Sequence, residues 1–311
     1  MRAWTCLLPL LLLLQTMMMM MMMMMVTEAR TSGFVRESSG YDELGVASGK
    51  KGVGLGPHHT LCTDMDAAAG GLGNVEWWYD WGHKKEAFAS CSGEPLGGRE
   101  YVPMIFDLNS LKTPHWAQTV AELAEHAFES RFIFGYNEPE THMDPREAAA
   151  YWIDAELLAE EFSFQLTSPC MVNYDERAKA WLSRFVAAFQ ASHDRPPRFD
   201  FMCLHAYFFE GHESIIMERI EEMAADYGRR VWLNEFACTP WEGCAADLQL
   251  KLMQKLLPLL TASPSVFRFA WFDARYNRPP PDNECSLLQE GNVTRLTPLG
   301  EYYNSAVLSV Q

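Results

Sequence analysis

Short runs of strand-forming residues alternate with helical patterns along most of this chain, and this alternation limits the possible folds more than any other feature. The runs are rich in β-branched and aromatic residues. A strand, a helix and a second strand in succession favour parallel pairing, because the helix returns the chain to the same edge of the sheet. The runs are 51–56, 75–81, 101–107, 131–136, 162–167, 199–207, 230–236 and 266–272. Eight parallel strands close into a barrel, so the sequence predicts the α/β class and a (β/α)8 TIM barrel.

Helices are predicted between several of these strands. The clearest start is at Asp144, a capping residue that is followed by Pro145 in the first turn and then by strong helix formers. In another segment the apolar residues Val120, Leu123 and Ala127 recur at helical spacing. The predicted helices cover 116–130, 148–161, 176–192, 213–227 and 245–260.

The N-terminus reads as a leader. Arg2 precedes an apolar stretch over 7–14 and a methionine run over 17–25, and small residues near Ala29 fit a cleavage site. We expect a signal peptide over 1–29, a flexible polar segment over 30–50 and a catalytic barrel over 51–311. The stretch 7–26 is about the length that spans a bilayer, so an uncleaved signal anchor is the alternative. The barrel is expected to be secreted and extracellular, or anchored and facing the lumen or cell exterior.

The charge of the chain limits its partners. The formal net charge is −16 and the pI is about 5.0. Nucleic acids and anionic membranes bind clustered Lys and Arg, so neither is expected as a partner, unless the leader is retained as a membrane anchor. A neutral polysaccharide is compatible with this charge, and the acidic composition suggests a soluble monomer.

The cysteines predict disulfides. Without Cys6, which would leave with the signal, an odd number of cysteines remains, so at least one thiol should be free or pair with another molecule. Cys238 and Cys244 bracket a short loop and are the first candidate pair, whereas Cys203 lies in a strand-like run and is expected to be a buried thiol. No cysteine or histidine cluster has the spacing of a metal site. Asn292 begins an N-glycosylation sequon.

Two glutamates follow apolar strands. Glu138 lies just after the run 131–136, and Glu235 closes the run 230–236. The active sites of parallel barrels lie at the carboxyl ends of the strands, where these two side chains can converge. Glycosidic bonds are cleaved by such a carboxylate pair, one giving a proton and the other acting at the anomeric carbon. Either glutamate alone would be read as a strand-end residue in a surface ion pair. Two with the same pattern favour glycoside hydrolysis.

Ordered motifs carry a family resemblance. They are WWYDWG at 77–82, GYNEPE at 135–140, DPREAAAYW at 144–152, LHAY at 204–207, WLNEFA at 232–237 and AWF at 270–272. Together they resemble glycoside hydrolase family 128, from about residue 51 to the C-terminus. The resemblance implies a β-1,3-glucanase that retains the anomeric configuration, with Glu138 as acid/base and Glu235 as nucleophile. This mechanism requires no cofactor and no catalytic metal, although a metal could still stabilise a loop.

Other residues are candidates for substrate binding. Asn137 could donate its amide to a sugar 2-hydroxyl, or it could be a turn residue bonded to its own backbone. His205 and Tyr207 share one strand face, and Tyr207 could orient the nucleophile. His205 could bind a sugar hydroxyl or tune a carboxylate, or it could be a satisfied core residue. Pyranose rings pack on aromatic rings, so Trp81 and Trp271 are expected at the cleft, whereas Trp77 and Trp78 stay unassigned.

Two alternatives stay open. Barrels with the same glutamate pair also cleave β-1,4-glucan or mannan. A non-catalytic β-glucan-binding protein would keep the aromatic cleft, although it would not need two glutamates. The exact linkage, and the choice between endo and exo action, cannot be read from one sequence.

Overall fold

The computed structural model describes residues 49–56, 61–84, 99–126, 130–239, 242–276, 284–291 and 293–306. They belong to one compact unit, Ala47–Gln311. The expected signal peptide, most of the polar segment and the sequon at Asn292 lie outside the described residues. Within the described ranges, no helix combines the length and apolarity that a membrane span requires.

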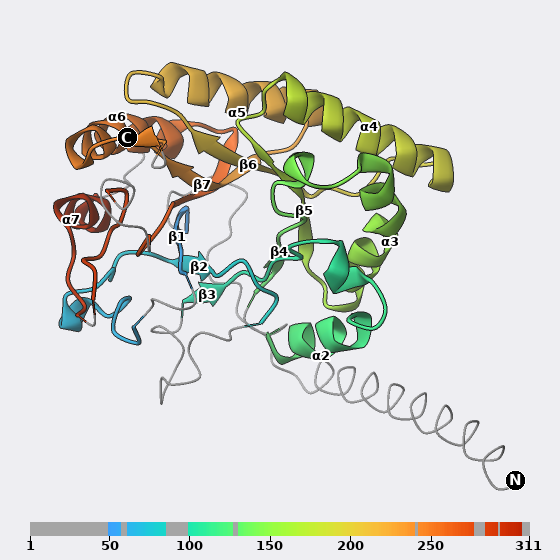
Figure 1. The fold of residues 1–311 in the computed structure, drawn as a ribbon, viewed down its shortest axis with the longest axis horizontal. Coiled ribbons are helices and arrows are strands. Elements are labelled where there is room, and N and C mark those ends of the chain that lie inside the picture. The colour runs from blue at the N-terminus through green and yellow to red at the C-terminus, as the bar shows by residue number, and fades with distance from the viewer. Residues whose placement is uncertain are drawn as a thin grey trace, which may run out of the picture. The chain divides into compact units, whose positions relative to one another are not determined.

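Eight parallel strands form the centre of the fold (Figure 1). They are β1 Lys51–Gly54, β2 Trp77–Tyr79, β3 Glu100–Tyr101, β4 Phe132–Ile133, β5 Gln165–Val172, β6 Phe201–Tyr207, β7 Val231–Ala237 and β8 Val266–Trp271. Their order in the sheet is β3-β2-β1-β8-β7-β6-β5-β4. The ring closes just beyond β3 and β4, where Met104 and Phe134 form a parallel bridge. The predicted (β/α)8 barrel is confirmed.

The helices lie outside the strands (Figure 1). They are α2 Trp116–His126, α3 Pro145–Glu161, α4 Glu176–His193, α5 Glu213–Tyr227, α6 Ala246–Ala262 and α7 Pro298–Ser305. The side chain of Asp144 accepts hydrogen bonds from the first-turn amides of α3, and Asp175 does the same for α4. Such caps supply partners for amides that have none within the helix. The sequence did not predict α7, which begins at Pro298 behind a Thr297 cap.

The predicted strand 162–167 is wrong in its position. Helix α3 runs to Glu161, and the amide of Phe162 still donates to Leu158 as the helix ends. The chain turns at Ser163, whose φ is 57°, and β5 then extends from Gln165 to Val172. Pro169 lies inside this strand, next to a register shift. Because proline is rare within strands, its presence argued against predicting a strand here from the sequence.

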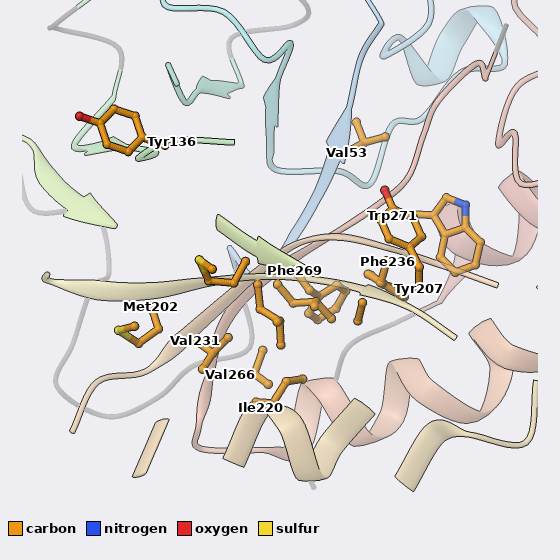
Figure 2. Close-up of a cluster of buried hydrophobic side chains, with 14 of the residues drawn as sticks. Val53, Tyr136, Met202, Tyr207, Ile220, Val231, Phe236, Val266, Phe269 and Trp271 are labelled. Carbon is orange, nitrogen blue, oxygen red and sulfur yellow. The ribbon is translucent and has the colours of Figure 1, made fainter. Parts of the chain in front are cut away.

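Two apolar clusters fill the fold. The smaller one includes Trp77, Phe134 and Trp232, which come from different strands and pack ring against ring inside the barrel. The larger one lies between the strands and the helices, and Figure 2 shows part of it, including Phe269 and Ile220. Side chains alternate along a strand, so Trp77 points into the barrel and Trp78 belongs to the outer cluster. Neither tryptophan is exposed.

Candidate active site

The candidate site is built at the carboxyl ends of four strands. Glu138 follows β4, His205 and Tyr207 end β6, and Glu235 lies near the end of β7. His205 and Glu235 are direct neighbours in the β6–β7 pairing, just after a register shift. Trp81 follows β2 on the far side of the ring. The fold therefore brings together residues that are far apart in sequence, as in other barrels of this kind.

Glu235 is buried and accepts two side-chain hydrogen bonds. Trp81 Nε1 donates to Oε1 at 2.6 Å, and the Tyr207 hydroxyl donates to Oε2 at 2.5 Å. Only 3% of this glutamate is exposed. Both oxygens thus face donors, which favour the ionised form of a carboxyl group. The backbone is fixed as well, because the Tyr79 hydroxyl donates to the carbonyl of Asn234 at 2.8 Å.

His205 lies between the two glutamates. Its Nδ1 is 2.8 Å from Glu138 Oε1 and 3.4 Å from Glu235 Oε2. A carboxylate only accepts hydrogen bonds, so Nδ1 carries the hydrogen and donates it to Glu138. The imidazole is fully buried, whereas the Glu138 side chain is 30% exposed. Glu138 can therefore exchange a proton with a group that enters from solvent, and His205 cannot.

The three groups alter one another's pKa. Burial lowers the pKa of His205, but the charges of Glu235 and Glu138 outweigh this effect and raise it above its usual value. Burial raises the pKa of Glu138, but the hydrogen bond and charge of His205 hold it below its usual range. For Glu235, burial raises the pKa, and the charge of His205 and the Tyr207 and Trp81 donors do not fully offset that rise. These shifts favour a proton on His205 next to an ionised Glu138.

Asn137 and Glu138 form a tight turn after β4. The amide of Asn137 donates to the carbonyl of Phe106 at 2.9 Å, and Asn137 is only 9% exposed. Its Oδ1 atom is buried and has no hydrogen-bond partner among the described residues. Glu138 has φ 44° and ψ 45°, in the left-handed region. Asn137 therefore lies beside the candidate acid with part of its amide unused by the protein.

Trp271 does not line the cleft, so that prediction is wrong. It is fully buried, its Nε1 donates to the carbonyl of Cys285 at 2.7 Å, and it packs on Phe236 in the outer cluster (Figure 2). The next residue, Phe272, points the other way, with its ring 5.9 Å from Trp81 and 5.5 Å from Tyr207. Alternation along β8 assigns opposite faces to Trp271 and Phe272, but the sequence did not tell which face was inward.

The cysteines are arranged differently from the expectation in one respect. Cys203 is bonded to Cys170 on the neighbouring strand, so it is not a free thiol. Cys238 and Cys244 form a disulfide just after β7, so the predicted pair is confirmed. Cys62 is also disulfide-bonded, and Cys285 is a buried free thiol. The Cys170–Cys203 bridge is directly below the site, because Cys203 precedes His205 by two residues on one face of β6.

Two groups of described residues have metal-ligating atoms within 4.8 Å of one another. One is Glu138, His205 and Glu235, and the other is Cys170, Cys203 and His205. The sulfur atoms of the second group are joined in a disulfide, so they are not thiolates. The carboxylates of the first group accept hydrogen bonds from His205, Tyr207 and Trp81. These residues fit a proton-sharing network better than a cation site.

A parallel barrel with two glutamates close together at its strand ends is typical of the glycosidase barrels. The chain belongs to the glycosyl hydrolase catalytic core family, whose model matches residues 57–303. Its fold is that of solved structures of glycoside hydrolase family 128, the family that the sequence resembles.

Two solved structures and one further relative illustrate this similarity. A family 128 subgroup II endo-β-1,3-glucanase from Sorangium cellulosum is 26% identical, with a TM-score of 0.68 over 83% of this chain and 98% of that one. The corresponding enzyme from Pseudomonas viridiflava is 26% identical, with a TM-score of 0.68 over 84% of this chain and 98% of that one. Alkali-sensitive linkage protein 1 of Schizosaccharomyces pombe is 28% identical over 235 residues, 72% of this chain. The match spans only 39% of the length of that relative.

Proposed function

We propose that this protein is a secreted endo-β-1,3-glucanase that acts with retention of anomeric configuration. Glu138 is the acid/base and Glu235 the nucleophile. The observation that carries the proposal is the pair of glutamates: one oxygen of each lies within 4.8 Å of the other, with His205 between them. Retaining glycosidases have carboxyl groups about 5–5.5 Å apart, whereas inverting ones leave about 6.5–9.5 Å for a water molecule.

The hydrogen bonds support this assignment of roles. Both oxygens of Glu235 face protein donors, which suits an anion that attacks the anomeric carbon. Glu138 accepts the hydrogen bond from His205 through Oε1, and its side chain is partly exposed. This suits a group that gives a proton to the oxygen of the departing sugar. The amide oxygen of Asn137, next to Glu138, has no hydrogen-bond partner within the described part of the chain, which supports a role for this residue in binding a sugar hydroxyl.

The proposed reaction has two steps. In the first, a Glu235 oxygen bonds to the anomeric carbon while the bond to the departing sugar breaks, and that oxygen takes a proton from Glu138. The proton comes from the His205–Glu138 pair, which shares it across a 2.8 Å hydrogen bond. In the second step water attacks the anomeric carbon, Glu138 takes a proton from the water, and Glu235 leaves as a carboxylate. Glu138 acts as an acid in the first step and as a base in the second. Each step inverts the configuration at the anomeric carbon, so the two steps together retain it.

The substrate assignment rests on relatives. The two bacterial structures at 26% identity are described as endo-β-1,3-glucanases. A more distant family 128 structure, from Amycolatopsis mediterranei, was solved with laminarihexaose. Secretion is proposed from the leader and is supported by the disulfides, which persist in oxidising compartments.

The test is hydrolysis of laminarin by wild type, Glu138→Gln and Glu235→Gln, with the anomer of the first product followed by NMR. We expect a β product and a loss of about 10³-fold or more in each variant. Exposed Glu147→Gln is the matched control. An α product would overturn retention, and full activity of Glu235→Gln would overturn the nucleophile. Cleavage of β-1,4-glucan or mannan instead would overturn the substrate, and binding without cleavage would indicate a β-glucan-binding protein.

An activated substrate separates the two roles. A β-glucoside oligomer with a dinitrophenyl leaving group does not need an acid in the first step. Glu138→Gln should then accumulate a glycosyl adduct on Glu235, detectable by mass spectrometry of the intact protein. Glu235→Gln should form no adduct. An adduct in Glu235→Gln and none in Glu138→Gln would mean that Glu138 is the nucleophile and Glu235 the acid/base.

A further inference from the structure

Glu140 is a buried carboxyl close to the site, and the proposed mechanism does not use it. It lies in the short 3-10 helix η5, Pro139–Thr141, two residues after Glu138. Only 8% of Glu140 is exposed, although glutamate is rarely buried without a charged partner. Its Oε2 is buried and has no hydrogen-bond partner among the described residues. Burying such a group is costly, so its position needs a physical reason.

The turn that Glu140 belongs to is strained at Glu138. Left-handed backbone conformations cost an L-residue about 1–2 kcal/mol, and Glu138 has φ 44°. Such a conformation persists only where its surroundings hold it. The amide of Glu138 donates to the carbonyl of Cys170 at 3.0 Å, and the carbonyl of Glu138 accepts from the amide of Thr141 at 3.1 Å. These bonds fix the backbone of Glu138 itself.

Glu140 anchors the far side of the same turn. Its Oε1 accepts a hydrogen bond from the amide of Val172 at 2.6 Å. Its backbone carbonyl accepts one from Arg177 at 2.8 Å. Val172 ends β5 and is paired in register with His205 on β6. Glu140 thus ties the turn of Glu138 to the strand edge at the level of His205, the residue that Glu138 contacts.

We propose that Glu140 is a positioning residue for Glu138: its carboxyl clamps the turn onto the Val172 amide, so that Glu138 Oε1 meets His205 Nδ1. The proposal deepens the proposed function, since it takes Glu138 as the acid/base. Glu140 itself does not touch the reacting atoms.

The charge of Glu140 is consistent with this role. Burial raises the pKa of Glu140 to about 7, against the opposing hydrogen bond from the Val172 amide. Near neutral pH much of the Glu140 population is therefore uncharged. An uncharged anchor can hold the turn without adding a full negative charge beside Glu138 and His205. A charge on Glu140 would raise the pKa of His205.

The first experiment compares Glu140→Ala with Glu140→Gln. Alanine removes the acceptor for the Val172 amide, and glutamine keeps an oxygen in its place. We expect Glu140→Ala to lower kcat on laminarin by about 10- to 100-fold with little change in KM, because small misplacements of a catalytic group have effects of this size. Glu140→Gln should stay within about fivefold of wild type. The matched controls are Glu147→Ala and Glu147→Gln, at an exposed glutamate paired with Lys112, and both should behave as wild type.

A second readout does not depend on turnover. The Nδ1–H signal of His205, followed by NMR in protein labelled in its histidine rings, reports the hydrogen bond to Glu138. Glu140→Ala should shift or broaden this signal, and Glu140→Gln should keep it. If wild type cleaves no glucan but the signal responds in this way, the proposed function fails and the positioning role stands.

Two outcomes would overturn the proposal. One is a folded Glu140→Ala with the kcat and His205 signal of wild type. The other is an equal loss in Glu140→Gln and Glu140→Ala, which would mean that the acceptor oxygen is not what matters. If Glu140→Ala does not fold, Arg177→Met is the substitute variant. It removes the hydrogen bond from Arg177 to the backbone carbonyl of Glu140, the second contact that holds the turn. That variant should shift the His205 signal in the same direction, and an unchanged signal would contradict the proposal.

Discussion

Tyr207 is one of the two side chains that stabilise the charge of Glu235 through a hydrogen bond, the other being Trp81. The Tyr207 hydroxyl is buried and lies 2.5 Å from Glu235 Oε2. Burial and the negative charge of Glu235 raise the pKa of this phenol well above its usual value, so it stays a donor.

Tyr207→Phe should therefore raise the pKa of Glu235 further. A hydrogen bond to a charged group is worth about 1.5–3 kcal/mol, and one pKa unit corresponds to about 1.4 kcal/mol. We expect the acid limb of kcat/KM to move up by about one unit and kcat to fall roughly 10-fold or more. A pH–rate profile measures this change. An unmoved acid limb would mean that Tyr207 does not stabilise the ionised form of Glu235.

The wild-type profile should be bell-shaped. In the proposed mechanism Glu235 must be ionised, and burial raises its pKa, so activity is lost as the pH falls through that raised pKa. In the same mechanism the His205–Glu138 pair must keep its proton. Burial lowers the pKa of His205, but the charges of Glu235 and Glu138 raise it above its usual value, so activity is lost as the pH rises through that raised pKa. The two limbs describe coupled groups rather than single residues. An alkaline limb near pH 5 would contradict the role of His205.

At the scale of the element, neighbouring strands are joined where the chemistry is concentrated. The Cys170–Cys203 disulfide links β5 to β6 at residues paired in register. The carbonyl of Cys170 accepts the amide hydrogen of Glu138, and Cys203 lies two residues before His205. The bridge thus connects the two strands that contact Glu138 and carry His205. The Cys238–Cys244 bridge closes only a local loop.

Removal of the two bridges should have different effects. In the loop-entropy model, a bridge across 33 residues stabilises the fold by about 4 kcal/mol and one across 6 residues by about 2 kcal/mol. We expect the Cys170→Ala, Cys203→Ala double variant to lose more stability in urea unfolding than the Cys238→Ala, Cys244→Ala variant. Under conditions where both are folded, only the first should lower kcat. Equal losses of kcat would contradict a link between the first bridge and the site.

At the scale of the whole molecule, the barrel is closed unevenly. β6 and β7 pair over most of their length, whereas the closure beyond β3 and β4 is an isolated bridge between Met104 and Phe134. Three backbone amide hydrogen bonds support this seam: Ile105 donates to Phe134 at 3.0 Å, Phe134 donates to Pro103 at 2.9 Å, and Asn137 donates to Phe106 at 2.9 Å. Local opening is easiest where few backbone bonds must break together.

Hydrogen exchange should reveal this seam. We expect the amides of Ile105 and Phe134 to exchange faster than buried amides in the β6–β7 pairing, such as those of Leu204 and Leu233. Both sets are buried, so solvent exposure does not account for a difference. Equal protection would show that the ring opens only by global unfolding.

The sequence by itself determined the barrel, the order of its strands along the chain, and the two glutamates. These features depend on local patterns: alternation, helix caps such as Asp144, and polar residues that follow apolar strands. The tertiary structure decided the contacts between strands. It paired Cys203 with Cys170, turned Trp271 into the core and Phe272 toward Trp81, and placed His205 between Glu138 and Glu235. Strand register and the inward face of each strand decide such contacts, and both are set by packing across the whole ring.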